Sequence, residues 1–278
     1  MTRLRDALNK VEGGERASAP VLHPREPMRA GAEPVSAGRP GGLPASLPEF
    51  ERGVPDVAPL WPADALPGIP AEFHRELSAL RFSVESAMPD RATRVVLFTA
   101  AVPGEGTTTV AASFARILAQ DPTQSVLLVD ANVRRPGLAL YFGLPAGPGL
   151  REIVQAGQAM EAAVQPVERQ NLHVLPALPM VGESAHLFAL EAVREFWAVF
   201  GRRYQWVIVD AAPILEAPET AMLATTVDTT LVVIQAARTK RGVVTRAMDV
   251  FGKAGAPVLG AVLNRRRLDI PEFIYRRT

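Results

Sequence analysis

The 278-residue chain contains no cysteine, which excludes disulfide bonds, cysteine-ligated metals and a cysteine nucleophile. It has no apolar run near the roughly 20 residues that a membrane-spanning helix needs, and its N-terminus lacks the apolar core of a signal peptide. The formal net charge is +1, so no strong positive potential favours nucleic acid. We therefore expect a cytoplasmic protein that reaches a membrane only through a partner.

Composition divides the chain near residue 70. Twelve of the 25 prolines and eight of the 21 glycines lie before Ala71. Such a segment cannot bury enough apolar surface to offset its ordering entropy, so residues 18–70 are expected to form a disordered tether. Residues 1–17 carry apolar side chains at helical spacing among basic ones, which indicates either a short amphipathic helix or a frayed terminus.

The stretch Arg94–Gln120 predicts a strand, a glycine loop and a helix. Val95–Phe98 form an apolar run typical of a buried strand, and helical spacing of apolar residues resumes at Val110. Between them, Gly104 and Gly106 interrupt the pattern. This order is the outline of a phosphate-binding P-loop, in which backbone N–H groups and a helix N-terminus favour an oxyanion.

This P-loop lacks its lysine. The usual pattern G-x-x-x-x-G-K-[ST] places lysine after the last glycine, where this chain has Thr107, while Thr108 keeps the position of the Mg²⁺-ligating hydroxyl. A threonine hydroxyl can hydrogen-bond to phosphate but cannot neutralise it. Lysines occur only at positions 10, 240 and 253, so Lys240 or an arginine would have to supply the charge through folding. Alternatively, the threonines at 107–109 simply cap the helix.

Strand-like and helix-like segments alternate after residue 70. Because the apolar strands are continuous, we predict an α/β domain, a doubly wound and mostly parallel sheet of the P-loop NTPase type, over residues 71–271, followed by a basic tail at 272–278. Beyond the P-loop unit, strands are expected at 125–130, 171–178, 206–210, 229–235 and 257–264, and helices from about 71, at 145–156, 183–200, near 219 and at 240–254.

Two of these strands end in an acid, Asp130 and Asp210. Ligands of parallel sheets bind beyond the carboxyl ends of the strands, so both acids are expected to meet the P-loop. Two carboxylates beside a Mg²⁺-nucleotide can ligate the metal, directly or through water, and polarise the attacking group. Alternatively, each aspartate is a helix cap or turn former. Arg134 and Arg135 follow the same strand as Asp130 and either clamp phosphate or face solvent.

With these motifs laid out, the chain resembles the cytoplasmic domain of bacterial tyrosine autokinases from capsule and exopolysaccharide loci, relatives of the partition-type P-loop ATPases. The resemblance covers nearly all of residues 71–271. It is carried by PGEGTTT at 103–109, VLLVDANVRRP at 126–136, FGLPAGPGLREIV at 142–154, NLHVLPALP at 171–179, WVIVDAAPIL at 206–215 and VLGAVLNR at 258–265.

This resemblance implies ATP or ADP and Mg²⁺ as cofactors, Asp130 as catalytic base, and Thr108, Asp130 and Asp210 as metal ligands. It also implies a membrane polysaccharide co-polymerase or export protein as partner, a homo-oligomer, and no nucleic acid. The nucleotide-binding residues that it implies are Gly104, Glu105, Gly106, Thr107, Thr108, Thr109 and Arg134.

Several positions depart from the family pattern. Thr107 replaces the phosphate-binding lysine, and Asn132 replaces the second acid of the D-x-D motif. Glu72 and Arg75 match the family's E-x-x-R-x-x-R assembly helix, but position 78 is a serine, and the tail offers only Tyr275 in place of a tyrosine cluster.

These losses lead us to expect a pseudokinase, a regulatory partner in polysaccharide export with a degenerate ATP site. A second hypothesis is an active tyrosine kinase in which Arg134, Arg135 or Lys240 replaces the missing charge. A third is a partition-type positioning ATPase.

Overall fold

The computed structural model describes residues 68–145, 147–156, 163–167, 169–179 and 190–265. The helix expected at 1–17, nearly all of the tether expected at 18–70, and the tail at 272–278 with Tyr275 lie outside the described residues. None of the described helices combines the length and the apolar composition that crossing a membrane would require.

The described residues form strands and helices in alternation. The strands are β1 (Arg94–Ala100), β2 (Val126–Asp130), β3 (Gln165–Val167), β4 (Arg169–Leu175), β5 (Trp206–Asp210), β6 (Thr229–Gln235) and β7 (Val258–Asn264). The helices are α2 (Ala71–Ala87), α3 (Thr107–Leu118), α4 (Leu138–Phe142), α5 (Leu150–Ala156), α7 (Leu190–Gly201), α8 (Pro218–Ala224) and α9 (Arg241–Ala254).

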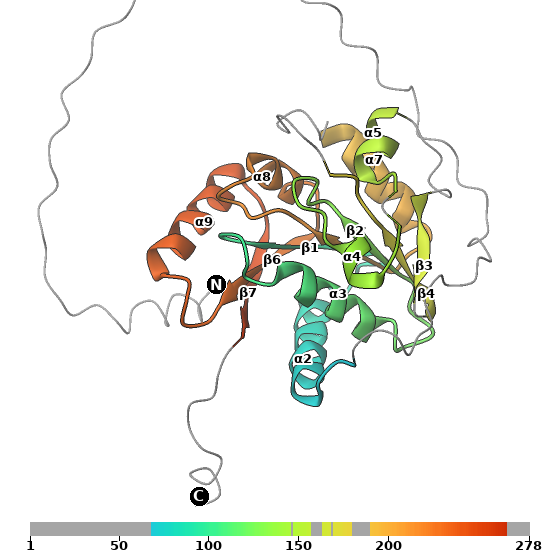
Figure 1. Cartoon of the computed structure of the whole chain (residues 1–278), viewed down its shortest axis with the longest axis horizontal. Helices are drawn as coiled ribbons and strands as arrows, with labels where there is room; N and C mark the ends of the chain where they lie inside the picture. Colours follow the sequence, from blue (N-terminus) through green and yellow to red (C-terminus); the bar gives the residue numbers. More distant parts are fainter. Residues whose placement is uncertain (1–67, 146, 157–162, 168, 180–189, 266–278) are drawn as a thin grey trace, which may run out of the picture. The chain divides into compact units, whose positions relative to one another are not determined.

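All seven strands belong to one sheet, in the order β3-β4-β2-β5-β1-β6-β7 (Figure 1). Every pairing is parallel except that of β3 with β4, which is antiparallel. The strand that leads into the P-loop, β1, lies in the interior of the sheet between β5 and β6. The expected mostly parallel α/β sheet is therefore confirmed.

Helices cover both faces of the sheet, as the continuous apolar strands predict (Figure 1). One core lies under α2, α3 and α4, and the strands supply alternate residues to it, such as Val96 and Phe98 of β1. The other core lies under α5, α7, α8 and α9 and receives the intervening residues, such as Val95 and Leu97. This period-two division of each strand fixes its register against its neighbours.

Some element predictions were wrong in detail. The helix expected at 145–156 is α5, which begins only at Leu150. The short helix α4 before it, whose C-cap Gly143 takes a left-handed conformation (φ 65°), was not predicted. The short antiparallel strand β3 was missed, since three residues carry too little periodicity to be recognised. The helix expected at 183–200 is described only as α7, from Leu190 onward.

Candidate phosphate-binding site

The loop between β1 and α3 has the backbone of a phosphate loop. Gly104 and Gly106 have φ values of 83° and 90°, a region that side chains with a Cβ rarely adopt. A Cβ at Gly106 would also collide with the side-chain amide of Asn264. Helix α3 then begins at Thr107, and no side chain of the described residues caps its N-terminus. The free backbone N–H groups of the first turn therefore remain available to an anion.

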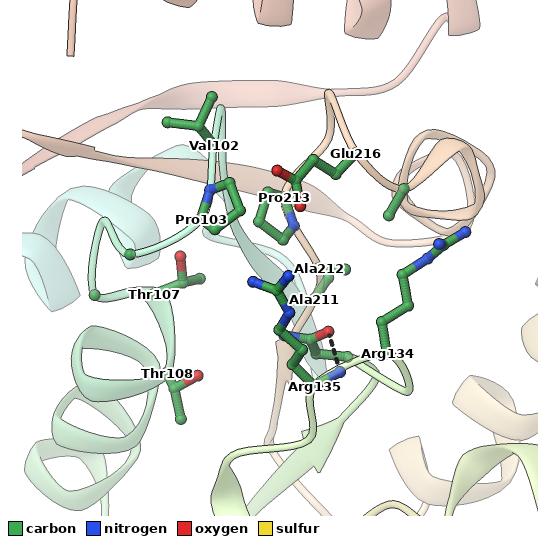
Figure 2. A pocket seen from close by; sticks show the side chains of 14 residues that line it. Val102, Pro103, Thr107, Thr108, Arg134, Arg135, Ala211, Ala212, Pro213 and Glu216 are labelled. Atoms are coloured by element: carbon green, nitrogen blue, oxygen red, sulfur yellow. Dashed lines mark hydrogen bonds between the residues drawn. The ribbon is translucent and has the colours of Figure 1, made fainter. Parts of the chain in front are cut away.

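A pocket of about 370 Å³ opens beside this loop (Figure 2). One wall comes from the P-loop and the start of α3, another from the turn after β2, and a third from the segment after β5. The lining residues are Val102, Pro103, Gly104, Gly106, Thr107, Thr108, Asn132, Arg134, Arg135, Ala211, Ala212, Pro213, Glu216 and Ala217. Segments distant in sequence thus meet at the carboxyl ends of β1, β2 and β5, as predicted.

Asp130, at the end of β2, is completely buried and is held by backbone donors. Its Oδ1 accepts a hydrogen bond from the N–H of Asn132 (3.1 Å), and its Oδ2 accepts from Gly137 (2.9 Å) and Leu138 (3.0 Å). Burial raises the pKa of Asp130 to about 6, although these three bonds act in the opposite direction. Asp130 therefore shapes the turn between β2 and α4, so the alternative of a turn former describes its side chain well.

Asp210, at the end of β5, is equally buried but lacks such support. Within the described residues, neither of its carboxylate oxygens has a hydrogen-bond partner. Burial first, and then the charge of neighbouring Asp130, raise the pKa of Asp210 well above its usual value. The Thr108 hydroxyl offsets part of this rise, although it stands outside hydrogen-bonding geometry.

These groups fit a Mg²⁺ ion. An unpartnered buried carboxylate is costly, and a divalent cation or a proton relieves the cost. Thr108 lines the pocket. Asp130 and Asp210 do not line it, but each lies close in sequence to a lining residue, Asn132 and Ala211 respectively. In the described part of the chain, no cluster of three or more His, Cys, Asp or Glu side chains could hold a metal by itself. Phosphate oxygens and waters would complete the shell, as Mg²⁺ prefers.

The two arginines after β2 take different directions (Figure 2). Arg134 points toward α8, where its guanidinium forms an ion pair with the buried Glu219 (Nε–Oε1 2.6 Å, Nη2–Oε2 3.3 Å). Arg135 extends into the pocket, facing Thr107 and Pro213. Its backbone N–H is tied to Asn132, but its guanidinium makes no hydrogen bond or ion pair with the described residues. The cation available to a ligand is therefore Arg135 more than Arg134.

The remaining predicted residues are distributed unevenly. Thr107 and Thr108 line the pocket, but Thr109 does not. The side chain of Glu105 is buried and bonded to other parts of the protein, so only its backbone could contact a nucleotide. Lys240 is exposed at the start of α9 and is not among the lining residues, so the structure does not bring it into the pocket.

Sequence reasoning missed the wall formed by residues 211–217, including the exposed acid Glu216. Their position directly after the strand-end Asp210 was the available signal. It also missed Asn132 as a turn residue: its Oδ1 accepts from the N–H of Arg135 (3.2 Å). Asn132 thus helps to hold the Arg134–Arg135 segment at the pocket edge.

Among known proteins, the chain is similar to the tyrosine-protein kinase YwqD of Bacillus subtilis, at 31% identity over 189 residues that cover 68% of this chain and 79% of YwqD. It is 30% identical to the putative tyrosine-protein kinase EpsB of Ralstonia nicotianae over 194 residues, 68% of this chain. The chain spans only 25% of the length of EpsB. No protein-family profile matches the sequence.

Solved structures agree with these relatives. The kinase domain of the Escherichia coli tyrosine kinase Etk superposes with a TM-score of 0.64 at 25% identity, covering 71% of this chain and 79% of that domain. Cobyrinic acid a,c-diamide synthase of Mycobacterium smegmatis, solved with an ATP analogue and magnesium, shares the fold alone (TM-score 0.52, 20% identity, 63% of this chain and 77% of that one). The YwqD match, with which the Etk kinase domain agrees, shows that the chain belongs to the bacterial tyrosine-protein kinase family.

Proposed function

We propose that the chain binds ATP or ADP with Mg²⁺ in the pocket beside the P-loop and serves as a regulatory partner in polysaccharide export, with phosphoryl transfer largely lost. One observation carries this proposal. Thr107 stands where the P-loop pattern has its phosphate-binding lysine, while Thr108 lines the pocket at the start of α3 and Asp130 and Asp210 end the adjacent strands β2 and β5.

Nucleotide binding is supported by the backbone of the loop. Helix α3 is 12 residues long, so its N-terminus carries a substantial positive partial charge. The left-handed glycines at 104 and 106 let the chain approach a phosphate closely. Arg135 adds a full positive charge from the opposite wall. These three contributions favour a polyphosphate even without a lysine.

Thr108 and Asp210, with Asp130 behind them, are the residues that would hold Mg²⁺. When bound, Mg²⁺ would neutralise the charge that develops on the phosphate. Thr108 would offer its hydroxyl oxygen, and Asp210 would offer a carboxylate that has no hydrogen-bond partner among the described residues. Asp130 would keep the turn after β2 in place through its three backbone bonds.

Phosphoryl transfer should suffer most from the missing lysine. Loss of one preorganised donor at a developing charge costs about 2–4 kcal/mol of transition-state stabilisation, which is roughly thirtyfold to a thousandfold in rate. Asn132 adds to the loss, because its amide oxygen is engaged in the turn after β2 and carries no charge. The same groups still suffice for binding, which needs a favourable site but not a stabilised transition state.

A specific observation also favours an active tyrosine kinase. The Arg135 guanidinium projects into the pocket toward Thr107, so it could take over the role of the lysine (Figure 2). In that case Asp130, whose pKa is raised to about 6, would accept the proton of a tyrosine hydroxyl.

Two measurements on the purified full chain test the proposal. Isothermal titration with ADP and Mg²⁺ should show saturable binding, and incubation with labelled ATP and Mg²⁺ should give far less than one phosphotyrosine per chain. Stoichiometric phosphotyrosine that disappears in an R135Q variant would establish the active kinase instead. No heat of binding with ADP, together with no phosphotyrosine from labelled ATP, would reject both.

The partner role is tested in cells. Membrane recruitment and a polysaccharide co-polymerase or export partner are inferred from the family resemblance. Deleting the gene should therefore lower extracellular polysaccharide, and the wild-type chain should restore it. Unchanged polysaccharide in the deletion strain would contradict the partner role without bearing on nucleotide binding.

A further inference from the structure

Glu105 is the one acidic residue within the P-loop sequence PGEGTTT, and its side chain is only 2% exposed. Its Oε2 accepts hydrogen bonds from the backbone N–H groups of Ala101 (2.9 Å) and Val102 (3.2 Å). The carboxylate therefore closes the first turn of the loop onto the end of β1. This contact fixes the segment that leads to Gly106 and to the N-terminus of α3, where a phosphate would bind.

The other oxygen of Glu105 reaches a different part of the sheet. Its Oε1 accepts from the backbone N–H of Gln235 (3.2 Å), at the end of β6, and from the hydroxyl of Thr239, just before α9. The carbonyl oxygen of Glu105 also accepts from Nδ2 of Asn264 (2.7 Å), at the end of β7. One residue thus attaches the phosphate loop to the ends of two further strands.

The segments attached in this way carry unusual backbone conformations. Ala237 (φ 60°) and Arg265 (φ 55°) are the only non-glycine residues with positive φ in the described ranges. Ala237 lies between the two Glu105 partners Gln235 and Thr239, and Arg265 directly follows Asn264. Such conformations are unfavourable for residues with a Cβ and persist only where surrounding contacts impose them. The P-loop, the β6–α9 connection and the end of β7 are therefore held as one assembly.

Both side-chain oxygens of residue 105 must accept hydrogen bonds, and a carboxylate provides two acceptors. Three of the four groups that bond to the Glu105 carboxylate are backbone N–H groups, which can only donate. In the described part of the chain no lysine or arginine forms an ion pair with it, so its charge is balanced by these hydrogen bonds. A glutamine would offer one acceptor oxygen and turn an NH₂ group toward the other donors.

We propose that Glu105 is a positioning residue that couples phosphate binding at the P-loop to the order of residues 235–239. This inference rests on the proposed nucleotide binding. Glu105 does not contact the ligand through its side chain. It acts through the loop backbone, and a phosphate that orders the loop also tightens the contacts of Glu105 with Gln235 and Thr239.

The test combines isothermal titration and hydrogen exchange on the full chain with ADP and Mg²⁺. In the wild type, ADP should slow exchange in residues 235–239. In E105Q, the internal hydrogen bonds that hold the loop in its binding conformation are weakened, so ADP affinity should fall about tenfold and this slowing should disappear. ADP binding within twofold of wild type, with the slowing retained, would overturn the proposal.

Two further variants keep the test decisive. Thr239→Val removes one donor and keeps the side-chain shape, so it should weaken ADP about threefold and reduce the slowing even if E105Q folds poorly. Glu152→Gln is the matched control, since Glu152 accepts a hydrogen bond from the N–H of Gly149 (2.9 Å) at α5. It should leave both readouts unchanged, and an equal effect from this control would overturn the proposal.

The outcome separates the two proposals. If wild-type chain fails to bind ADP, the proposed nucleotide function fails. The positioning role of Glu105 is then tested by hydrogen exchange without nucleotide. In this measurement E105Q should speed exchange of the Gln235 amide at least tenfold relative to wild type. Equal exchange rates at Gln235 would reject the positioning role itself.

Discussion

Asp130 and Asp210 lie directly opposite each other on the adjacent parallel strands β2 and β5, and neither side chain is exposed to solvent. The surroundings treat the two acids differently. Asp130 accepts three backbone hydrogen bonds, whereas the Asp210 carboxylate has no partner within the described residues. Burial raises the pKa of both acids, and the charge of neighbouring Asp130 adds to the rise at Asp210. The pair of acids is therefore more stable with a bound cation than without one.

Replacing Asp210 by asparagine should therefore stabilise the protein without ligand. The change removes a carboxylate that must be either charged and unpaired or protonated at neutral pH. We expect the free energy of unfolding in urea at pH 7 to rise by about 1–2 kcal/mol. The same variant should lose the Mg²⁺ dependence of ADP binding, measured by titration with and without the metal.

Asp228 supplies the contrasting control. It is also an aspartate next to the sheet, but it pairs with Arg91 (3.0 Å) and accepts from the N–H of Val95 (2.8 Å). Asp228→Asn should lower the free energy of unfolding by about 1 kcal/mol, because it weakens satisfied contacts. If both asparagine variants destabilise equally, Asp210 is an ordinary structural acid and the metal assignment is wrong.

His173 of β4 should make stability depend on pH. His173 is 1% exposed, and its ring lies edge-on to that of Tyr204 with the two ring centroids 5.5 Å apart. Neither ring nitrogen has a hydrogen-bond partner among the described residues. Burial first, and then the charge of Arg203, lower the pKa of His173 from 6.5 to about 4. The unfolded chain thus binds a proton more readily than the folded one between these values. Stability from this residue is present above pH 6.5 and is lost as the pH falls toward 4.

His173→Phe isolates that contribution, because other titrating groups cancel when variant and wild type are compared at each pH. The phenylalanine keeps the ring contact with Tyr204 and cannot take up a proton. The variant's advantage in free energy of unfolding should grow by about 3 kcal/mol between pH 7 and pH 4. A difference that stays constant over this range would mean that His173 gains water or a partner when it is protonated.

Thr107→Lys should restore the missing charge. Because the loop backbone, Thr108 and Asp210 keep their places, an ammonium at this position should tighten ADP binding in Mg²⁺ by tenfold or more, which calorimetry would detect. Thr109→Lys is the matched control, since it adds the same charge to the same helix at a position that does not line the pocket. Equal gains in the two variants would show a general charge effect and not a repaired phosphate site.

How much the sequence could predict differs between the fold and the site. The strand ending in Asp130 and the strand ending in Asp210 were predictable because parallel strands buried on both faces are continuously apolar. The partners of Asp130 were not predictable, since they are backbone N–H groups whose positions depend on the turn that leads into α4. Similarly, a motif cannot show that the side chain of Glu105 points toward β6 and not toward the ligand.

The two neighbouring arginines show the same limit. Two adjacent arginines carry the same charge, so the sequence RRP alone cannot distinguish them, and the family resemblance assigns only Arg134 to the nucleotide. The partner that distinguishes them, Glu219, lies 85 residues further along the chain. Such pairings depend on the topology of the sheet, so they become visible only in the folded structure.

This difference gives the last prediction. Arg135→Gln should weaken ADP binding in Mg²⁺ about tenfold, because it removes a charge that projects into the pocket, and should leave the unfolding free energy nearly unchanged. Arg134→Gln should do the reverse: it leaves buried Glu219 without its ion pair and should cost about 1 kcal/mol of stability, with a smaller effect on binding. Titration and urea unfolding of both variants would separate these effects. If Arg134→Gln weakens ADP more than Arg135→Gln does, Arg134 leaves Glu219 when the nucleotide binds, and the family assignment of Arg134 as the phosphate ligand is the correct one.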